Sequence, residues 1–261
     1  MIKNKLLLLL ILTSFIFTGC FETTEDLTIN ENGSGVYKLD MDFTGLFDMM
    51  DAMKAADTTG NATSGFPKER RDTTLYLRRF TDTAASLTAE QKALYQNVSM
   101  RLLMDAAAKE FKAGINMPFQ KIGDVEKLMK LVSSQKESGV LRKLFMQGQP
   151  MSHEESDGNV NLPDMNGYYD MTITKGVVAR SLNKAKYDSL MQSFSGELSS
   201  AQMEDMLAGV KLNTLIHLPH AAKKITGAAV VASDDKKTIR LTGSMSALFK
   251  NPQAFSYRIE Y

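Results

Sequence analysis

The pattern that most constrains this fold is a strict alternation of apolar and polar side chains over short segments. The clearest example is Tyr37–Phe43, with apolar side chains at the odd positions and Lys38, Asp40 and Asp42 between them. Successive side chains of a β-strand point to opposite faces. Each such strand therefore has one buried and one hydrated face, which is typical of an antiparallel sheet packed on one side.

Turn residues connect these segments into hairpins. Asn32-Gly33 supplies the positive φ of a tight turn within a first hairpin over Leu27–Phe43. Further strands are predicted where alternation returns, at residues 74–80, 98–104, 111–117, 168–174, 177–182, 210–218, 227–232, 238–243 and 255–261.

Helices are expected between the hairpins. Thr88-Ala89-Glu90-Gln91 matches a capping box, and Asp124 and Asn183 are placed to cap two more helices. A predicted hairpin followed by a predicted helix recurs along the chain. We therefore predict an α+β fold with a mostly antiparallel sheet, built from repeated β-hairpin–helix units with helices packed on one face.

Two polar stretches interrupt this plan. Residues 57–72 and 147–167 lack periodicity and carry Pro67, Pro150 and Pro163. They predict flexible excursions from one α+β domain over residues 27–261.

The first 19 residues predict a secretory signal peptide that is removed. Lys3 and Lys5 precede the run Leu6–Phe17, which has only Thr13 and Ser14 as polar residues. As a helix this run would be about 18 Å long, too short for a hydrocarbon core about 30 Å thick. A charged start and a short apolar run are typical of a signal.

The cleavage region Phe17-Thr18-Gly19-Cys20 resembles the lipobox of bacterial lipoproteins, with Phe17 where Leu is usual. The resemblance implies that Cys20 is lipidated and becomes the first mature residue, followed by a tether over residues 20–26. Cys20 is the only cysteine, so lipidation leaves no thiol for a disulfide, metal site or nucleophile. Phe21, rather than Asp, follows it, which by resemblance to enterobacterial sorting favours the outer membrane of a Gram-negative bacterium.

A second resemblance rests on Leu27–Phe43, Pro219 and Ser233–Tyr261. These segments are similar to uncharacterised LppM-like envelope lipoproteins. The resemblance implies an α+β domain, leaves open a lipid-binding cavity, and supplies no catalytic residues.

No metal site is expected. His217 and His220 are three apart on a strand and point to opposite faces, and His153 reads as a hydrated loop residue. The segment Asp157–Asn161 begins like a calcium loop, but Leu162 stands where that loop requires glycine.

No catalytic residue or cofactor is expected either. Ser133–Lys136 and Ser181–Lys184 match Ser-x-x-Lys, yet the companion motifs of the penicillin-binding enzymes are absent. The 17 methionines are interpreted mainly as core filling, in a soft interior that could still admit an acyl chain. Those on predicted buried faces are Met41, Met50, Met100, Met104, Met117, Met129 and Met191.

These features favour a lipid-anchored, non-enzymatic cell-envelope lipoprotein that acts as a binding or structural module. The alternative is a carrier or sensor of a lipid or other apolar ligand. Expected partners are the membrane, through the anchor, and an envelope protein or apolar ligand. The formal net charge is only +1 and both signs are interspersed, so the sequence shows no cluster of basic residues typical of nucleic-acid binding.

Overall fold

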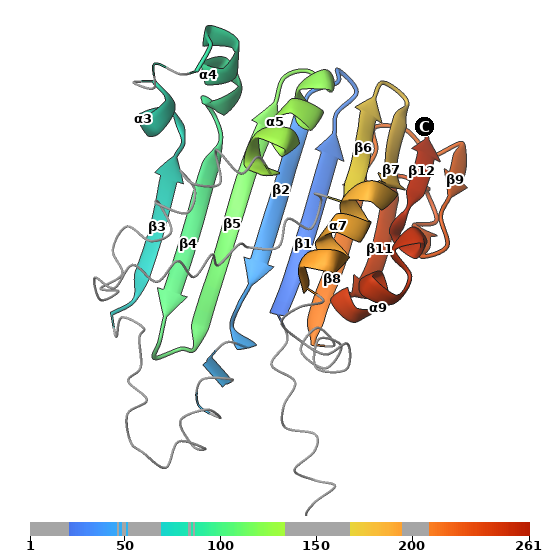
Figure 1. Ribbon diagram of the computed structural model, residues 1–261. Coiled ribbons are helices and arrows are strands. Elements are labelled where there is room, and N and C mark those ends of the chain that lie inside the picture. The colour runs from blue at the N-terminus through green and yellow to red at the C-terminus, as the bar shows by residue number, and fades with distance from the viewer. Residues whose placement is uncertain are drawn as a thin grey trace, which may run out of the picture.

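The computed structural model describes residues 21–45, 47–48, 51, 69–82, 85, 87–133, 168–194 and 209–261. These residues form a large eight-stranded sheet and a small four-stranded sheet (Figure 1). The strand order is β10-β11-β8-β1-β2-β5-β4-β3 in the large sheet and β6-β7-β12-β9 in the small sheet.

The strands of the large sheet are β1 (Phe21–Ile29), β2 (Gly35–Asp42), β3 (Arg71–Tyr76), β4 (Ser99–Asp105), β5 (Glu110–Phe119), β8 (Val210–His217), β10 (Val230–Ala232) and β11 (Thr238–Ser244). Those of the small sheet are β6 (Tyr169–Thr174), β7 (Val177–Leu182), β9 (Lys224–Thr226) and β12 (Tyr257–Glu260). The helices are α3 (Arg78–Thr81), α4 (Ala89–Tyr95), α5 (Gly123–Ser133), α7 (Lys184–Phe194), α9 (Met245–Lys250) and the 3-10 helix η1 (Pro252–Phe255).

The local hairpin signals are confirmed. β1 and β2 pair antiparallel with Leu27 opposite Tyr37, and Gly33 in the turn has φ +80°. Residues 98–104 and 111–117 fall largely in β4 and β5, and residues 168–174 and 177–182 fall in β6 and β7. The predicted strand over residues 74–80 is only partly right, because β3 ends at Tyr76 and α3 follows.

Two predicted helix starts are confirmed by their caps. The Thr88 hydroxyl accepts from the Gln91 N–H at 3.2 Å, and the Gln91 amide oxygen accepts from the Thr88 N–H at 2.9 Å. At α7, the Asn183 side-chain oxygen accepts from the Lys186 N–H at 3.2 Å. Asp124 is not the predicted cap of the next helix, because α5 begins at Gly123 and Asp124 lies in its first turn.

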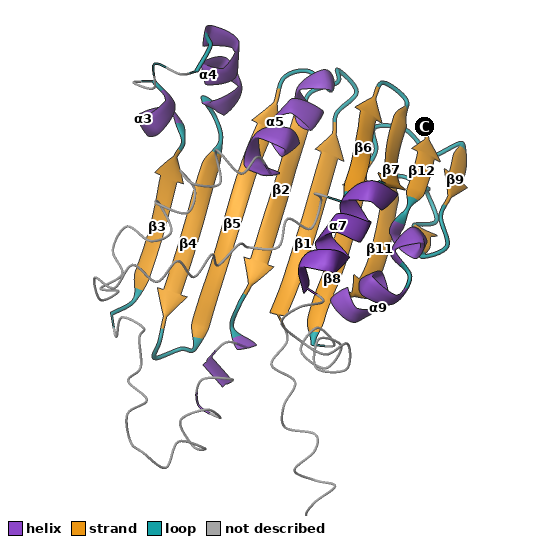
Figure 2. Cartoon of the chain, in the orientation of Figure 1, coloured by secondary structure: helices purple, strands orange, loops and turns teal. Residues whose placement is uncertain are grey.

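The predicted fold class is wrong. β1 pairs parallel to β8, with Phe21 opposite Val210, so the large sheet is mixed. The hairpin β6–β7 joins the small sheet with β12 and β9 instead of extending the large one. In the described residues the helices are few and short. α5, α7 and α9 follow the hairpins β4–β5, β6–β7 and β10–β11, but these hairpins lie in two different sheets and do not build one repeated layer (Figure 2). Alternation fixes which face of a strand is buried, but it does not fix which strand lies beside it.

One hydrophobic core joins the two sheets. Leu27 and Ile216 of the large sheet, Val178 and Ile259 of the small sheet, and Val125 of α5 are buried in the same cluster. We call the side of the large sheet that contributes to this core the inner face. α5 and α7 lie on the same side of the large sheet as the small sheet (Figure 2).

The opposite side of the large sheet is the outer face. On β2, buried Tyr37 alternates with exposed Lys38 and Asp40, as the sequence predicts.

The prediction of buried methionines is partly confirmed. The buried ones are Met100, Met104, Met117 and Met129, whereas Met41 and Met191 are only half-buried. Met50 lies outside the described residues.

Part of the expected domain organisation differs from the structure. Residues 21–26, assigned to a tether, lie inside β1, and Arg71 and Asp72, assigned to an excursion, begin β3. The excursion at 147–167 and the signal segment 1–19 lie outside the described residues. Within the part of the chain that is described, no helix is long and apolar enough to cross a membrane.

Candidate functional site

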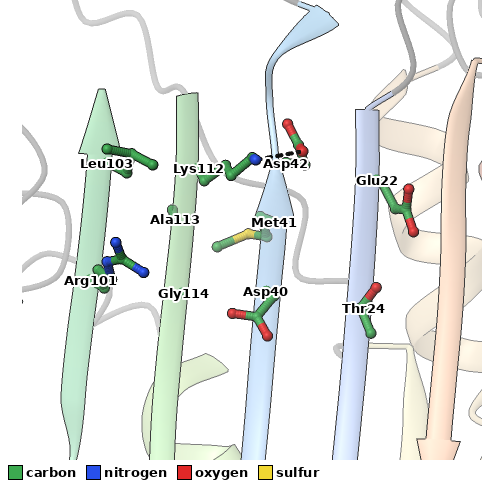
Figure 3. A pocket seen from close by; sticks show the side chains of 10 residues that line it. All are labelled: Glu22, Thr24, Asp40, Met41, Asp42, Arg101, Leu103, Lys112, Ala113 and Gly114. Atoms are coloured by element: carbon green, nitrogen blue, oxygen red, sulfur yellow. Dashed lines mark ion pairs between the residues drawn. The ribbon is translucent and has the colours of Figure 1, made fainter. Parts of the chain in front are cut away.

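A groove on the outer face is the best candidate for a binding site in the described structure. Its volume is about 370 Å³, and it crosses four neighbouring strands, β1, β2, β5 and β4 (Figure 3). The residues that line it are Glu22, Thr24, Asp40, Met41, Asp42, Arg101, Leu103, Lys112, Ala113 and Gly114.

Gly114 creates a gap in the middle of this groove. In the sheet register Gly114 lies between Asp40 on β2 and Arg101 on β4. A Cβ atom at position 114 would lie 2.7 Å from Oδ1 of Asp40. The missing side chain therefore leaves room for the Asp40 carboxylate over the strand, with a guanidinium on the other side of the gap.

The cations of the groove are already held by carboxylates. Arg101 donates from Nε and Nη2 to the two oxygens of Asp72 at 2.9 and 2.8 Å, and this hydrogen bonding lowers the pKa of Asp72. Lys112 Nζ lies 3.2 Å from Glu110 and 3.9 Å from Asp42. These groups hold their neighbours in place, so the groove presents an ordered polar surface.

The surroundings of the Asp40 carboxylate in the groove change its acidity. Desolvation in the groove raises the pKa of Asp40, while the nearby Lys38 ammonium opposes this rise. A carboxyl group with a raised pKa takes up a proton more readily than usual. It can therefore accept or donate a hydrogen bond to a polar ligand, depending on pH.

A second polar group on the outer face involves His217 of β8. Its Nδ1 lies 3.3 Å from the Thr238 hydroxyl, and its Nε2 lies 3.7 Å from Oδ1 of Asp26. The order hydroxyl, imidazole, carboxylate resembles a hydrolytic triad, but 3.7 Å is too long for the hydrogen bond that would orient the ring. In the described ranges no three His, Cys, Asp or Glu side chains are grouped to hold a metal ion.

A buried polar cluster lies between the two sheets. The Arg180 guanidinium of β7 donates to Glu25 of β1, and both side chains are buried. The guanidinium also lies 5.3 Å from the ring centre of Tyr169 and 5.6 Å from that of Tyr257. Burial alone would lower the pKa of Arg180, but the Glu25 carboxylate overcomes this and raises it. The residues of this cluster do not line the groove, and the ion pair links the two sheets.

Those residues singled out from the sequence that the structure describes do not form a site. Cys20 lies outside the described residues, directly before the first residue of β1. His153 and the segment Asp157–Asn161 are also outside them. The Ser181 hydroxyl donates to the Asp170 carbonyl at 3.4 Å, whereas Lys184 Nζ lies 2.8 Å from Asp188.

Ser181 and Lys184 therefore do not form a nucleophile–base pair. Ser133 ends α5, and its motif partner Lys136 lies outside the described residues. The groove is not predicted by any sequence motif considered above. One signal for it was Gly114 within an otherwise regular strand, because such a glycine often marks a close approach of another group.

Comparison with known proteins gives little further information. No family model and no curated protein matches the chain. Among solved structures, it is similar to the folded domain of LppM from Mycobacterium tuberculosis, determined by NMR. The TM-score is 0.34 and the sequence identity 6%, over 93% of this chain and 90% of that chain. A similarity of this size carries no argument about function.

Proposed function

We propose that this protein is a lipid-anchored, non-enzymatic module of the cell envelope that binds a polar partner on the outer face of its large sheet. The observation that carries the proposal is the position of its only cysteine. Cys20 follows an apolar leader and immediately precedes the first strand of the domain.

The position of β1 determines how closely such an anchor would hold the domain to the membrane. The Cα atoms of consecutive residues are about 3.8 Å apart, so a lipid on Cys20 would join the domain almost at Phe21. β1 is an interior strand, paired with β2 on one side and β8 on the other. A lipid at this point would hold the rigid sheet itself close to the membrane, without a flexible linker.

The outer groove supports a polar partner. Its lining combines the carboxylates of Glu22, Asp40 and Asp42 with the cations of Arg101 and Lys112. An apolar ligand would remove water from these charged groups without offering them new hydrogen bonds, which is costly. The groove therefore gives no support to the alternative of a lipid carrier, and a polar peptide or protein segment suits its chemistry better.

The anchor is tested by replacing the cysteine in the full chain. Cys20→Ser should abolish the added acyl mass, and the protein should no longer remain with the membrane fraction. Ser14→Ala, a small change within the apolar leader, is the matched control and should keep both properties. Mass spectrometry and membrane fractionation provide the two readouts. Unchanged processing and membrane retention of Cys20→Ser would refute the lipid anchor.

The binding face is tested by site-specific photocrosslinking in intact membranes. A crosslinking side chain at Thr24, in the groove, should capture a defined partner. The same side chain at Lys175, an exposed residue in the turn between β6 and β7, is the control. Equal capture at both positions would contradict a specific role for the groove. Native mass spectrometry that reveals a co-purifying lipid would instead favour the carrier.

A further inference from the structure

Three phenylalanine rings meet at the end of the large sheet where β1 begins. Phe21 is the first residue of β1, Phe43 follows β2, and Phe111 lies near the start of β5. The ring centres of Phe21 and Phe43 are 6.1 Å apart in an edge-to-face arrangement, and those of Phe43 and Phe111 are 5.2 Å apart. The Phe43 N–H donates to the Phe111 carbonyl at 2.8 Å, which fixes the backbone at this point. We call these three residues the phenylalanine cluster.

The phenylalanine cluster is separate from the hydrophobic core. All three residues are only half-buried. None of them belongs to the buried core, and none is among the partly buried side chains packed against it. Their packing on one another therefore leaves apolar ring surface in contact with solvent.

The ends of the neighbouring strands place this cluster beside the predicted anchor. The start of β1, the end of β2 and the start of β5 lie at the same end of the sheet (Figure 1). Phe21 is the residue next to Cys20 in the chain, so their Cα atoms are about 3.8 Å apart. Any acyl chain on Cys20 would enter the bilayer within a few ångströms of the cluster.

Among the described residues, two lysines near the cluster are paired with carboxylates. Lys109 Nζ lies 3.2 Å from Asp48 and 2.8 Å from Asp51, and Lys112 pairs with Glu110. These lysines are thus neutralised by neighbouring carboxylates. Attraction of this end to a membrane would come from the aromatic rings and not from charge.

We propose that the phenylalanine cluster rests in the interfacial region of the bilayer that holds the lipid of Cys20. The proposal depends on the lipid anchor put forward above. An aromatic ring that is already partly exposed gains by leaving water for the apolar side of the interface. Because the anchor brings the rings to the surface, even a weak preference suffices to keep them there. The bound domain would then have one preferred orientation, with the end of the sheet that carries Phe21 facing the membrane.

The chain contains no tryptophan, which allows single-tryptophan reporters. Phe43→Trp and Phe111→Trp place a reporter in the cluster. Tyr76→Trp is the matched control, because Tyr76 is 46% exposed and lies at the level of Asp26 in the sheet register. Five residues of strand separate that level from Phe21, which corresponds to about 17 Å.

The full-length, lipidated variants are reconstituted into phosphatidylcholine–phosphatidylethanolamine vesicles with and without brominated acyl chains. We expect bromine to reduce the emission of Phe43→Trp and Phe111→Trp and to leave that of Tyr76→Trp unchanged. The quenching should be the same at low and high salt. Circular dichroism confirms folding, and Phe21→Trp replaces any cluster variant that does not fold.

The outcomes separate the two proposals. Vesicle-bound protein whose cluster reporters are quenched no more than Tyr76→Trp would overturn the membrane contact and leave the anchor intact. Loss of the quenching at high salt would overturn its aromatic basis. If processed protein carries no acyl mass and does not float with vesicles, the anchor fails and the membrane contact fails with it.

Discussion

Arg180 on the small sheet donates a hydrogen bond to Glu25 on the large sheet, and both side chains are buried. The Thr214 hydroxyl lies 3.3 Å from the same oxygen of Glu25. Two charges removed from water are stable only when each is compensated by the other and by further polar groups. The pair therefore links the two sheets within the hydrophobic core that they share.

Removing one member of the pair should be strongly destabilising. Arg180→Met leaves the Glu25 carboxylate buried without its cation, and we expect a loss of about 3–5 kcal/mol in the free energy of unfolding. The double variant Arg180→Met with Glu25→Leu should recover much of this loss, because no unpaired charge remains. Urea denaturation measures both effects.

A surface ion pair of the same sheet provides the control. Arg258 Nε lies 2.9 Å from Glu260, and both side chains are exposed. Arg258→Met should cost less than about 1 kcal/mol. If Arg180→Met costs no more than Arg258→Met, the buried pair does not hold the sheets together.

Stability should fall at alkaline pH because of Tyr257. Burial raises the pKa of Tyr257 to about 12, with the Arg180 cation opposing the rise. The folded protein therefore keeps this phenol protonated above pH 10, where the unfolded chain loses the proton. Tyr257 therefore lowers the free energy of unfolding by about 2–3 kcal/mol as the pH rises from about 10 through 12, and it has no such effect below about pH 10.

Denaturation curves between pH 8 and 12 measure this loss. Tyr257→Phe should flatten the dependence, since the ring remains but the ionisable hydroxyl is gone. Tyr76→Phe, at an exposed position, should keep the wild-type slope. An unchanged slope in Tyr257→Phe would show that another group is responsible.

The capping box of α4 should contribute measurably to local stability. Thr88→Ala removes the acceptor for the Gln91 N–H and should cost about 1 kcal/mol. Thr88→Ser keeps a hydroxyl there and should cost much less. Hydrogen exchange at the Gln91 amide reports the difference directly. Equal exchange rates in Thr88→Ala and Thr88→Ser would rule out the cap as the source of protection.

Two glycines of the large sheet should respond differently to alanine. A Cβ at Gly35 would lie 2.0 Å from the Thr28 carbonyl oxygen and 2.5 Å from the Phe119 ring, so Gly35→Ala requires the backbone to move. At Gly114 the nearest atom belongs to the Asp40 side chain, which can rotate away.

We therefore expect Gly35→Ala to cost about 1–3 kcal/mol and Gly114→Ala considerably less. Thermal unfolding of the two variants provides the comparison. A larger loss for Gly114→Ala would mean that Asp40 is held rigidly in the groove.

The sequence predicts those features that depend on neighbouring residues. The turn at Gly33, the capping box at Thr88 and the cap at Asn183 each involve groups within a few positions of one another. Their chemistry is readable from short motifs. The alternation along β2 likewise identifies its buried face without knowledge of its neighbours.

Features formed between distant residues were not predictable in this way. Glu25 reads as part of a hydrated tether, because nothing near it indicates a cation 155 positions later. The assignment of β6 and β7 to a separate sheet depends on their pairing with β12, at the end of the chain. Such choices are made by three-dimensional packing and not by local preference.

The two candidate sites also differ in whether they depend on neighbouring or on distant residues. Cys20 is predicted from a contiguous leader motif, and its lipidation stays a prediction. The outer groove depends on the register that sets Gly114 between Asp40 and Arg101. Arg101 lies on the adjacent strand of the same hairpin as Gly114, but Asp40 comes from a strand much earlier in the chain.

The parallel pairing of β1 with β8 has a consequence for how the protein is made. Strand β1 is complete at Ile29, whereas its second neighbour begins only at Val210. Until the last fifth of the chain is being synthesised, one edge of this interior strand presents open hydrogen-bonding groups. A nascent or partly translocated chain therefore keeps this edge open to pairing with another chain until β8 is available, and a holding chaperone would be most useful during that interval.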